Sequence, residues 1–128
     1  ILSDMLGFLD WQEKEGLLVL NNENDFIGGG SYGFTSELPQ GDYKEGEPVR
    51  CKDVWFHMNS EDTLGISPAM YGEYVFTHYC NLASKFGLIY YGCCEPVHSI
   101  WEDYLSKIPG IRKVSISPWS DEKLWAVC

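Results

Sequence analysis

The chain has 128 residues, of which 45% are hydrophobic and 15% aromatic, so it carries enough apolar side chains to fold around a core. Its formal net charge is -10, from 19 acidic and 9 basic residues. This balance repels phosphate backbones, and no basic stripe interrupts it, which argues against nucleic-acid binding. The apolar runs are far shorter than a bilayer span and no signal peptide is recognisable, so no membrane association is expected.

The cysteines are odd in number and do not have the spacing of a disulfide scaffold; they lie at positions 51, 80, 93, 94 and 128. The adjacent pair Cys93 and Cys94 is not expected to form a disulfide, because the closed ring is strained. Reduced thiols and a cytoplasmic location are therefore expected.

The first fifty residues predict little regular structure. Leu2, Met5, Leu6 and Leu9 recur at helical spacing and predict an opening amphipathic helix. Residues 16–20, "GLLVL", read as a short strand. Residues 21–50 are rich in Asn, Gly, Ser, Pro and charge, and loops of this length are usually functional or mobile. The triple glycine lacks a G-x-G-x-x-G or G-K-[ST] pattern, so surface turns are favoured over a nucleotide site.

The second half alternates strands and helices. Strands are predicted at 53–58 ("DVWFHM"), 88–94 ("LIYYGCC") and 111–117 ("IRKVSIS"). A helix is predicted over 67–87, with Ser67 as N-cap, Pro68 at the first position and Gly87 at the end. A second helix is predicted over 96–110 from its apolar spacing. A third, capped by Ser120 or Asp121, is interrupted by the end of the sequence.

This β-α-β-α-β-α order predicts an α/β fold with a parallel sheet and right-handed crossovers. The nearly continuous apolar strands suit burial on both faces. A doubly wound sheet and a (β/α)8 barrel both satisfy the pattern, and periodicity does not choose between them.

In either architecture ligands bind at the carboxyl ends of the strands. The polar or reactive residues that follow the three strands are Ser60, Glu61 and Asp62, then Cys93, Cys94, Glu95 and His98, and then Ser117 and Trp119. They are expected to share one rim. Glu61 and Asp62 read either as an acid–base pair or as solvated carboxylates. Trp119 suits the flat face of a ligand or a lid. His57 and His78 are expected to be hydrogen-bonded structural residues.

The segment from Cys93 to His98 contains the atom types that bind zinc: thiolate, carboxylate and imidazole. Neighbouring residues on an extended segment point in opposite directions, so Cys93 and Cys94 are not expected to bind the same ion. The N-terminus of the following helix is expected to lower a cysteine pKa. The alternative is a structural cysteine pair beside a capping helix.

Three motifs occur in order over residues 61–121: "SPAMYGEYV" opens a helix, "YGCCEP" ends a strand and "SISPWSD" follows the last strand. Together they resemble the uroporphyrinogen decarboxylase superfamily, in the decarboxylase-like branch near the corrinoid-dependent methyltransferases. "YGCCEP" stands where methyltransferase relatives carry H-x-C-G. "SISPWSD" stands where decarboxylases have a strand leading to an aspartate–tryptophan pair.

The resemblance implies a (β/α)8 barrel, which takes roughly 250 residues. Residues 1–128 are thus expected to be a single incomplete barrel segment. Residues 1–50 would supply the helix, short strand and Gly-rich loop, and residues 51–128 the repeated β-α units. Exposed barrel edges would favour self-association.

The resemblance also implies a zinc site. In methyltransferase relatives the histidine and cysteine of H-x-C bind zinc with a later cysteine. Here Cys93 stands at the cysteine and Tyr91 at the histidine, so Cys94, Glu95 or His98 would complete the ligand set. The substrate side is assigned to Tyr91, Ser117 and Trp119, and catalysis to Ser60, Glu61 and Asp62.

Methyl transfer in corrinoid or one-carbon metabolism is the first functional hypothesis. A zinc-held substrate thiolate would attack a methyl-cobalt donor that a corrinoid protein supplies. The second hypothesis is cofactor-free decarboxylation of a tetrapyrrole by rim carboxylates and hydroxyls. It needs arginines, yet Arg50 and Arg112 are predicted to lie off the rim. The third is a non-catalytic barrel that binds a corrinoid partner. Activity is expected of the full-length enzyme rather than of this segment.

Overall fold

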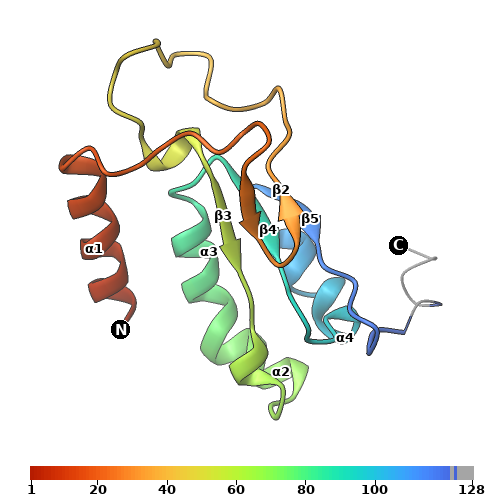
Figure 1. The fold of residues 1–128 in the computed structure, drawn as a ribbon. Helices are drawn as coiled ribbons and strands as arrows, with labels where there is room; N and C mark the ends of the chain where they lie inside the picture. The colour runs from red at the N-terminus through yellow and green to blue at the C-terminus, as the bar shows by residue number, and fades with distance from the viewer. Residues whose placement is uncertain (122, 124–128) are drawn as a thin grey trace.

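The computed structural model describes residues 1–121 and 123 (Figure 1). It is a mixed α/β structure in which an opening helix and a small hairpin precede strands that alternate with helices. The helices are α1 (Leu2–Lys14), α2 (Pro68–Tyr71), α3 (Thr77–Ala83) and α4 (His98–Trp101), and the strands are β1 (Phe26–Gly28), β2 (Ser31–Tyr32), β3 (Trp55–Met58), β4 (Leu88–Tyr91) and β5 (Ile111–Val114). None of the described helices combines the length and the apolar character that crossing a bilayer requires.

Strands β3, β4 and β5 form a parallel sheet in which neighbours in sequence are neighbours in space. Trp55 pairs with Leu88 and Met58 with Tyr91, so β3 and β4 end level with each other. Val114 at the end of β5 pairs with Tyr91 in turn. The predicted α/β architecture with consecutive parallel strands is confirmed, and all three carboxyl ends lie at one edge of the sheet.

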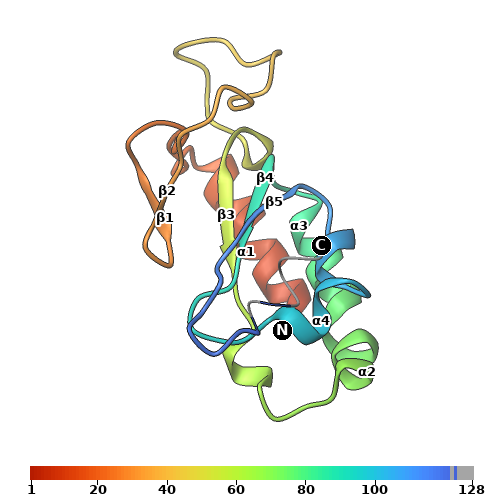
Figure 2. The same ribbon diagram turned by 90° about the vertical axis from the view of Figure 1, so that its right-hand side faces the viewer.

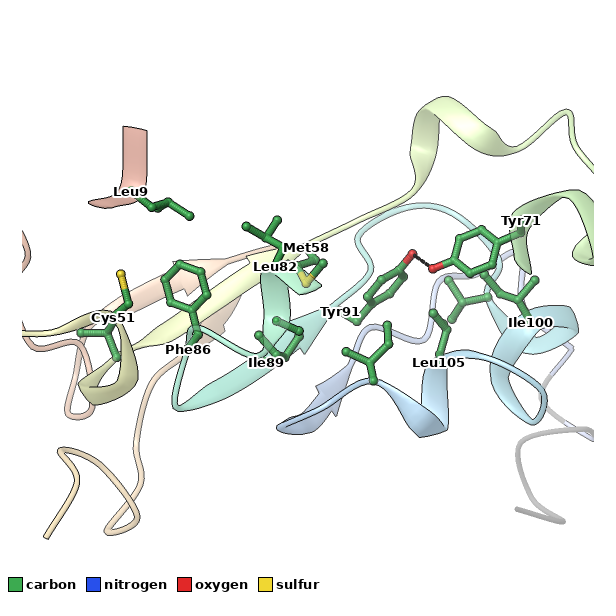
Figure 3. Packing of buried hydrophobic residues seen from close by; sticks show 14 residues of the cluster. Leu9, Cys51, Met58, Tyr71, Leu82, Phe86, Ile89, Tyr91, Ile100 and Leu105 are labelled. Carbon is green, nitrogen blue, oxygen red and sulfur yellow. Dashed lines mark hydrogen bonds between the residues drawn. The ribbon is translucent and has the colours of Figure 1, made fainter. Parts of the chain in front are cut away.

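Helices α3 and α4 lie on one face of this sheet, and α1 packs beside α3 (Figures 1 and 2). Because side chains alternate along a strand, Met58, Ile89 and Tyr91 all point toward this face. They form the main core with Leu82 of α3 and Leu105 (Figure 3). Burying one aliphatic side chain of this size contributes about 1.5–3 kcal/mol, so this layer is the main source of stability.

The opposite face is covered by the β1–β2 hairpin instead of by helices (Figure 2). Trp55 and Tyr90 form a second buried cluster there with Ile27 of the hairpin. The Trp55 indole N–H donates to the Gly33 carbonyl at 2.8 Å, and the Tyr90 hydroxyl donates to the Gly29 carbonyl at 3.0 Å. The long polar loop expected to lack regular structure thus contains a hairpin that packs on the sheet.

The strand predicted at 16–20 is wrong: this segment has no regular secondary structure. Its alternation is real, because Leu18 and Leu20 pack against the main core while Leu17 and Val19 are exposed. None of the described strands pairs with it, and a strand needs a hydrogen-bonded partner.

The helix predicted over 67–87 begins as expected. The Ser67 hydroxyl accepts a hydrogen bond from the Met70 N–H at 3.3 Å, and Pro68 occupies the first turn. Between α2 and α3 the helix widens into a π-helical turn, η3 (Gly72–Phe76). A Cβ atom at Gly72 would lie 2.4 Å from the Tyr104 ring. Glycine at this position therefore allows Tyr104 to pack directly on the helix backbone.

The single helix predicted over 96–110 is wrong. Only α4 and a separate 3-10 turn, η4 (Leu105–Lys107), form in this segment. Glu102 and Asp103 follow α4, and negative charge at a helix carboxyl end opposes the helix dipole. The further 3-10 turns are η1 (Cys51–Asp53) and η2 (Glu61–Thr63). The helix expected after Asp121, together with Cys128, lies outside the described residues.

Candidate metal centre

The turn after β4 begins at Gly92, which has a φ of +92°. Its N–H still donates to the Met58 carbonyl at 2.8 Å, so the sheet pairing continues to this residue. The His57 ring Nε2–H donates to the Gly92 carbonyl at 2.8 Å, which confirms the expected structural role of His57. Because the left-handed φ turns the chain out of the strand, the residues that follow no longer alternate between two faces.

This turn brings both thiols to the same place. The sulfurs of Cys93 and Cys94 are 3.6 Å apart. One carboxylate oxygen of Glu61, which follows β3, completes a cluster whose ligand atoms all lie within 4.8 Å of one another. Glu61 also accepts a hydrogen bond from the Cys94 N–H at 3.3 Å. The expectation that the two cysteines point in opposite directions is therefore wrong, because it assumed that the strand extends through them.

The donor set fits zinc. Two thiolates and one carboxylate are ligands that zinc takes, and catalytic zinc sites have three protein ligands plus one open position. In a tetrahedral site with Zn–S bonds of about 2.3 Å the two sulfurs are about 3.8 Å apart. The Cys93–Cys94 separation of 3.6 Å is close to that value. Cys94 and Glu61 are exposed and Cys93 is half-buried, so an ion and its fourth ligand can reach the cluster from solvent.

The Cys93 thiol holds its proton more tightly than expected, because its pKa is raised. The hydrogen bond between the two thiols, the hydrogen bond that the Cys93 thiol donates to the Glu61 carboxylate and partial desolvation raise the pKa of Cys93 to about 11. The predicted lowering of a cysteine pKa by the next helix is wrong for Cys93, because α4 has only four residues and begins at His98. A metal ion that binds here at neutral pH must displace the Cys93 proton.

Glu95 belongs to the framework of the centre and lies outside the cluster. It is 1% exposed, and its two oxygens accept hydrogen bonds from the Ser60 N–H at 2.8 Å and the Cys93 N–H at 2.9 Å. The Ser115 hydroxyl donates to the Cys93 carbonyl at 2.8 Å from the β5 side. Glu95 thus joins the chain before Glu61 to the chain at Cys93, and it fixes how far apart the ligands lie.

His98 also lies outside the cluster. Its Nδ1 accepts a hydrogen bond from the Asp121 N–H at 3.2 Å, which links α4 to the end of the turn after β5. The expected ligand set of Cys93 with Cys94, Glu95 or His98 is therefore replaced by Cys93, Cys94 and Glu61. Sequence spacing alone does not group Glu61 with the two cysteines, because Glu61 lies thirty-three positions from Cys94 and follows a different strand.

The remaining predicted site residues are divided between core and surface. Tyr91 is fully buried, and its hydroxyl pairs with that of Tyr71 at 2.8 Å inside the core (Figure 3). Ser60 and Ser117 are buried, whereas Asp62 is exposed. The Ser117 hydroxyl accepts the Trp119 N–H at 3.3 Å, so it shapes the turn instead of facing a ligand.

Trp119 is 75% exposed and lines an open hollow of about 470 Å³ at the rim. Leu64, Pro96 and Glu95 line the same hollow, and so do the cluster residues Glu61 and Cys94. Residues that follow β3, β4 and β5 therefore meet at one mouth, as expected from the parallel order. The hollow adjoins the cluster directly.

Comparisons with known protein families, with curated proteins and with solved structures gave no match.

Proposed function

We propose that the chain contributes the zinc-binding part of a thiol methyltransferase related to the uroporphyrinogen decarboxylase superfamily. The observation that carries the proposal is the Glu61–Cys93–Cys94 cluster at the carboxyl ends of consecutive parallel strands. Active sites of (β/α)8 barrels lie at this edge. Two crossovers on the same face of the sheet and the order β3-β4-β5 are compatible with consecutive strands of such a barrel.

In this proposal Cys93 and Cys94 bind the metal as thiolates and Glu61 binds it through one carboxylate oxygen. Glu95 accepts the Cys93 N–H, which orients the Cys93 backbone and keeps the three ligands at binding distance. Zinc held by these residues would supply a Lewis acid that lowers the pKa of a substrate thiol. The hollow beside Cys94 and Glu61 receives the rest of the substrate.

The reaction is a nucleophilic displacement at a methyl carbon. The substrate thiol first loses its proton to solvent. Its sulfur then forms the new bond to the methyl group of a methyl-cobalt donor. The methyl-cobalt donor would supply the methyl group, and the electron pair of its carbon–cobalt bond would leave with the cobalt, which would go from Co(III) to Co(I). A partner corrinoid protein supplies the donor, and this chain supplies the position of the thiol.

Methyl transfer is favoured over tetrapyrrole decarboxylation by the positions of the two arginines. A substrate with many carboxylates needs cations at the rim. Arg50 forms ion pairs with Asp42 and Asp53, and Arg112 pairs with Glu37. Neither arginine is among the residues that line the hollow.

Metal analysis of the purified protein tests the proposal. We expect one zinc per chain, lost on Cys93→Ser or Cys94→Ser and retained on Cys80→Ser, a matched change at a half-buried cysteine on α3. In the full-length protein, transfer of the methyl group from methylcobalamin to a thiol, followed by the loss of methylcobalamin absorbance, should depend on the same two cysteines. Protein that binds no added zinc and is indifferent to both substitutions refutes the proposal.

A further inference from the structure

The hollow at the rim lies beside the cluster, so it can hold the rest of a substrate whose thiol is the fourth ligand of the metal. It is lined by two of the three cluster residues, Glu61 and Cys94, and its volume of about 470 Å³ suits a small molecule. Its other walls carry apolar groups, including Leu64, which is 59% exposed, and Trp119. The chemistry of these walls therefore selects among thiol substrates.

Negative charge dominates the hollow. Two thiolates and one carboxylate outweigh the charge of a divalent ion, and a substrate thiolate adds a further negative charge. Glu95 also lines the hollow, while its carboxylate is buried and accepts the Ser60 and Cys93 N–H groups. No lysine or arginine within the described part of the chain lines the hollow; Lys52, Lys85 and Arg112 form ion pairs elsewhere. A second anionic group on the substrate would meet only repulsion.

Trp119 offers a ring face that attracts positively charged groups. Its backbone is held in a turn, where its N–H donates to the Ser117 hydroxyl at 3.3 Å and the Ser120 N–H donates to the Ser117 carbonyl at 3.0 Å. The indole itself is 75% exposed at the edge of the hollow. The face of a tryptophan ring attracts ammonium groups through its quadrupole, more strongly than other aromatic rings do.

We propose that the thiol received at the Glu61–Cys93–Cys94 cluster carries an ammonium group, which lies in the hollow against Trp119. This inference rests on the proposed zinc-thiol chemistry and adds the substrate class: a small cationic aminothiol, in preference to a neutral or acidic thiol. The carboxylates set the sign of the preferred charge, and the indole supplies the contact surface.

Binding of small thiols to the cobalt(II)-loaded protein tests this inference. Cysteamine, 2-mercaptoethanol and thioglycolate are similar in size and differ in charge, and each reports through the sulfur-to-cobalt absorption band. Affinities are expressed per thiolate, which removes the differences in thiol acidity. We expect cysteamine to bind about tenfold more tightly than thioglycolate at low salt, with 2-mercaptoethanol between them, and a smaller difference at high salt.

Substitution of the tryptophan separates its contribution from that of the carboxylates. Trp119→Ala should weaken cysteamine binding about two- to fivefold and leave 2-mercaptoethanol nearly unchanged. Trp11→Ala is the matched control, because Trp11 is 50% exposed on α1 and lies outside the hollow. It should change neither affinity.

The outcomes separate the two proposals. If cobalt and zinc fail to bind, the zinc-thiol proposal fails and the inference falls with it. If cobalt binds and thioglycolate binds as tightly as cysteamine, or Trp119→Ala changes nothing, the metal centre stands and the cationic substrate class is refuted.

Discussion

Replacing Glu95 with glutamine measures how much one buried carboxyl group contributes to the centre. Its two oxygens accept the Ser60 N–H at 2.8 Å and the Cys93 N–H at 2.9 Å, and the residue is 1% exposed. Glutamine keeps the size and one acceptor. Its amide nitrogen, however, meets the second N–H donor, so one hydrogen bond is lost and a buried donor has no acceptor.

A hydrogen bond to a charged acceptor contributes about 1.5–3 kcal/mol, and a buried donor without a partner costs about 1–3 kcal/mol. We therefore expect Glu95→Gln to lower the free energy of unfolding by about 3 kcal/mol, which corresponds to about 12 °C in Tm for a domain of this size. Thermal unfolding in metal-free buffer, followed by circular dichroism, measures the shift. Zinc affinity should also fall about tenfold or more, because the ligands are no longer held at a fixed separation.

Glu61→Gln is the matched control. It makes the same chemical change at an exposed residue whose contact with the Cys94 N–H is longer, at 3.3 Å. We expect its unfolding free energy to change by less than about 0.5 kcal/mol, while zinc binding is lost with the ligand. A Tm for Glu95→Gln within about 2 °C of the unsubstituted protein would refute the assignment of Glu95 as the anchor of the two turns.

Three further results are expected. Because the pKa of Cys93 is about 11, zinc must displace its proton, so zinc affinity should rise about tenfold per pH unit per displaced proton between about pH 6 and 8. Calorimetric titrations in buffers of different ionisation enthalpy count the displaced protons. A zinc affinity that does not change with pH contradicts this expectation. Gly72→Ala should destabilise the fold by about 1–3 kcal/mol in urea unfolding, because its Cβ would lie 2.4 Å from the Tyr104 ring. Gly65→Ala is the control, because Gly65 has open space around it, and it should not destabilise the fold. Equal urea midpoints for the two variants would contradict a steric clash at Gly72. Tyr71→Phe removes the 2.8 Å hydroxyl contact with Tyr91 and should cost about 1 kcal/mol, and an unchanged urea midpoint would show that the pair contributes nothing.

The order of strands and helices in the second half of the chain could be read from the sequence because local patterns determine it. The three apolar strands, the Ser67–Pro68 helix start and the parallel pairing all follow from residue types at short spacing. The sharing of one rim by the strand ends follows from the parallel order alone. For this reason the sequence alone predicts that Glu61, Cys94 and Trp119 lie together.

The details of the centre depend on backbone geometry that residue types do not specify. The strand pattern continues through "LIYYGCC", but Gly92 adopts a positive φ and ends the alternation one residue before Cys93. The sequence predicts Glu95 as a ligand because it is an acidic neighbour of two cysteines. Its carboxyl group instead turns inward to two backbone N–H groups. A glycine between an apolar strand and a polar run is the signal that could have indicated the turn.

The hairpin on the helix-free face has a consequence for any barrel that includes this sheet. In a (β/α)8 barrel the helices form the outer ring, so the other face looks toward the axis. Here β1 and β2 pack on that face, and Trp55 and Tyr90 donate hydrogen bonds to the carbonyls of Gly33 and Gly29. The interior of such a barrel is filled by side chains, so closure would require the hairpin to leave Trp55 and Tyr90. The hairpin and barrel closure are therefore alternative ways of covering the same face of the sheet.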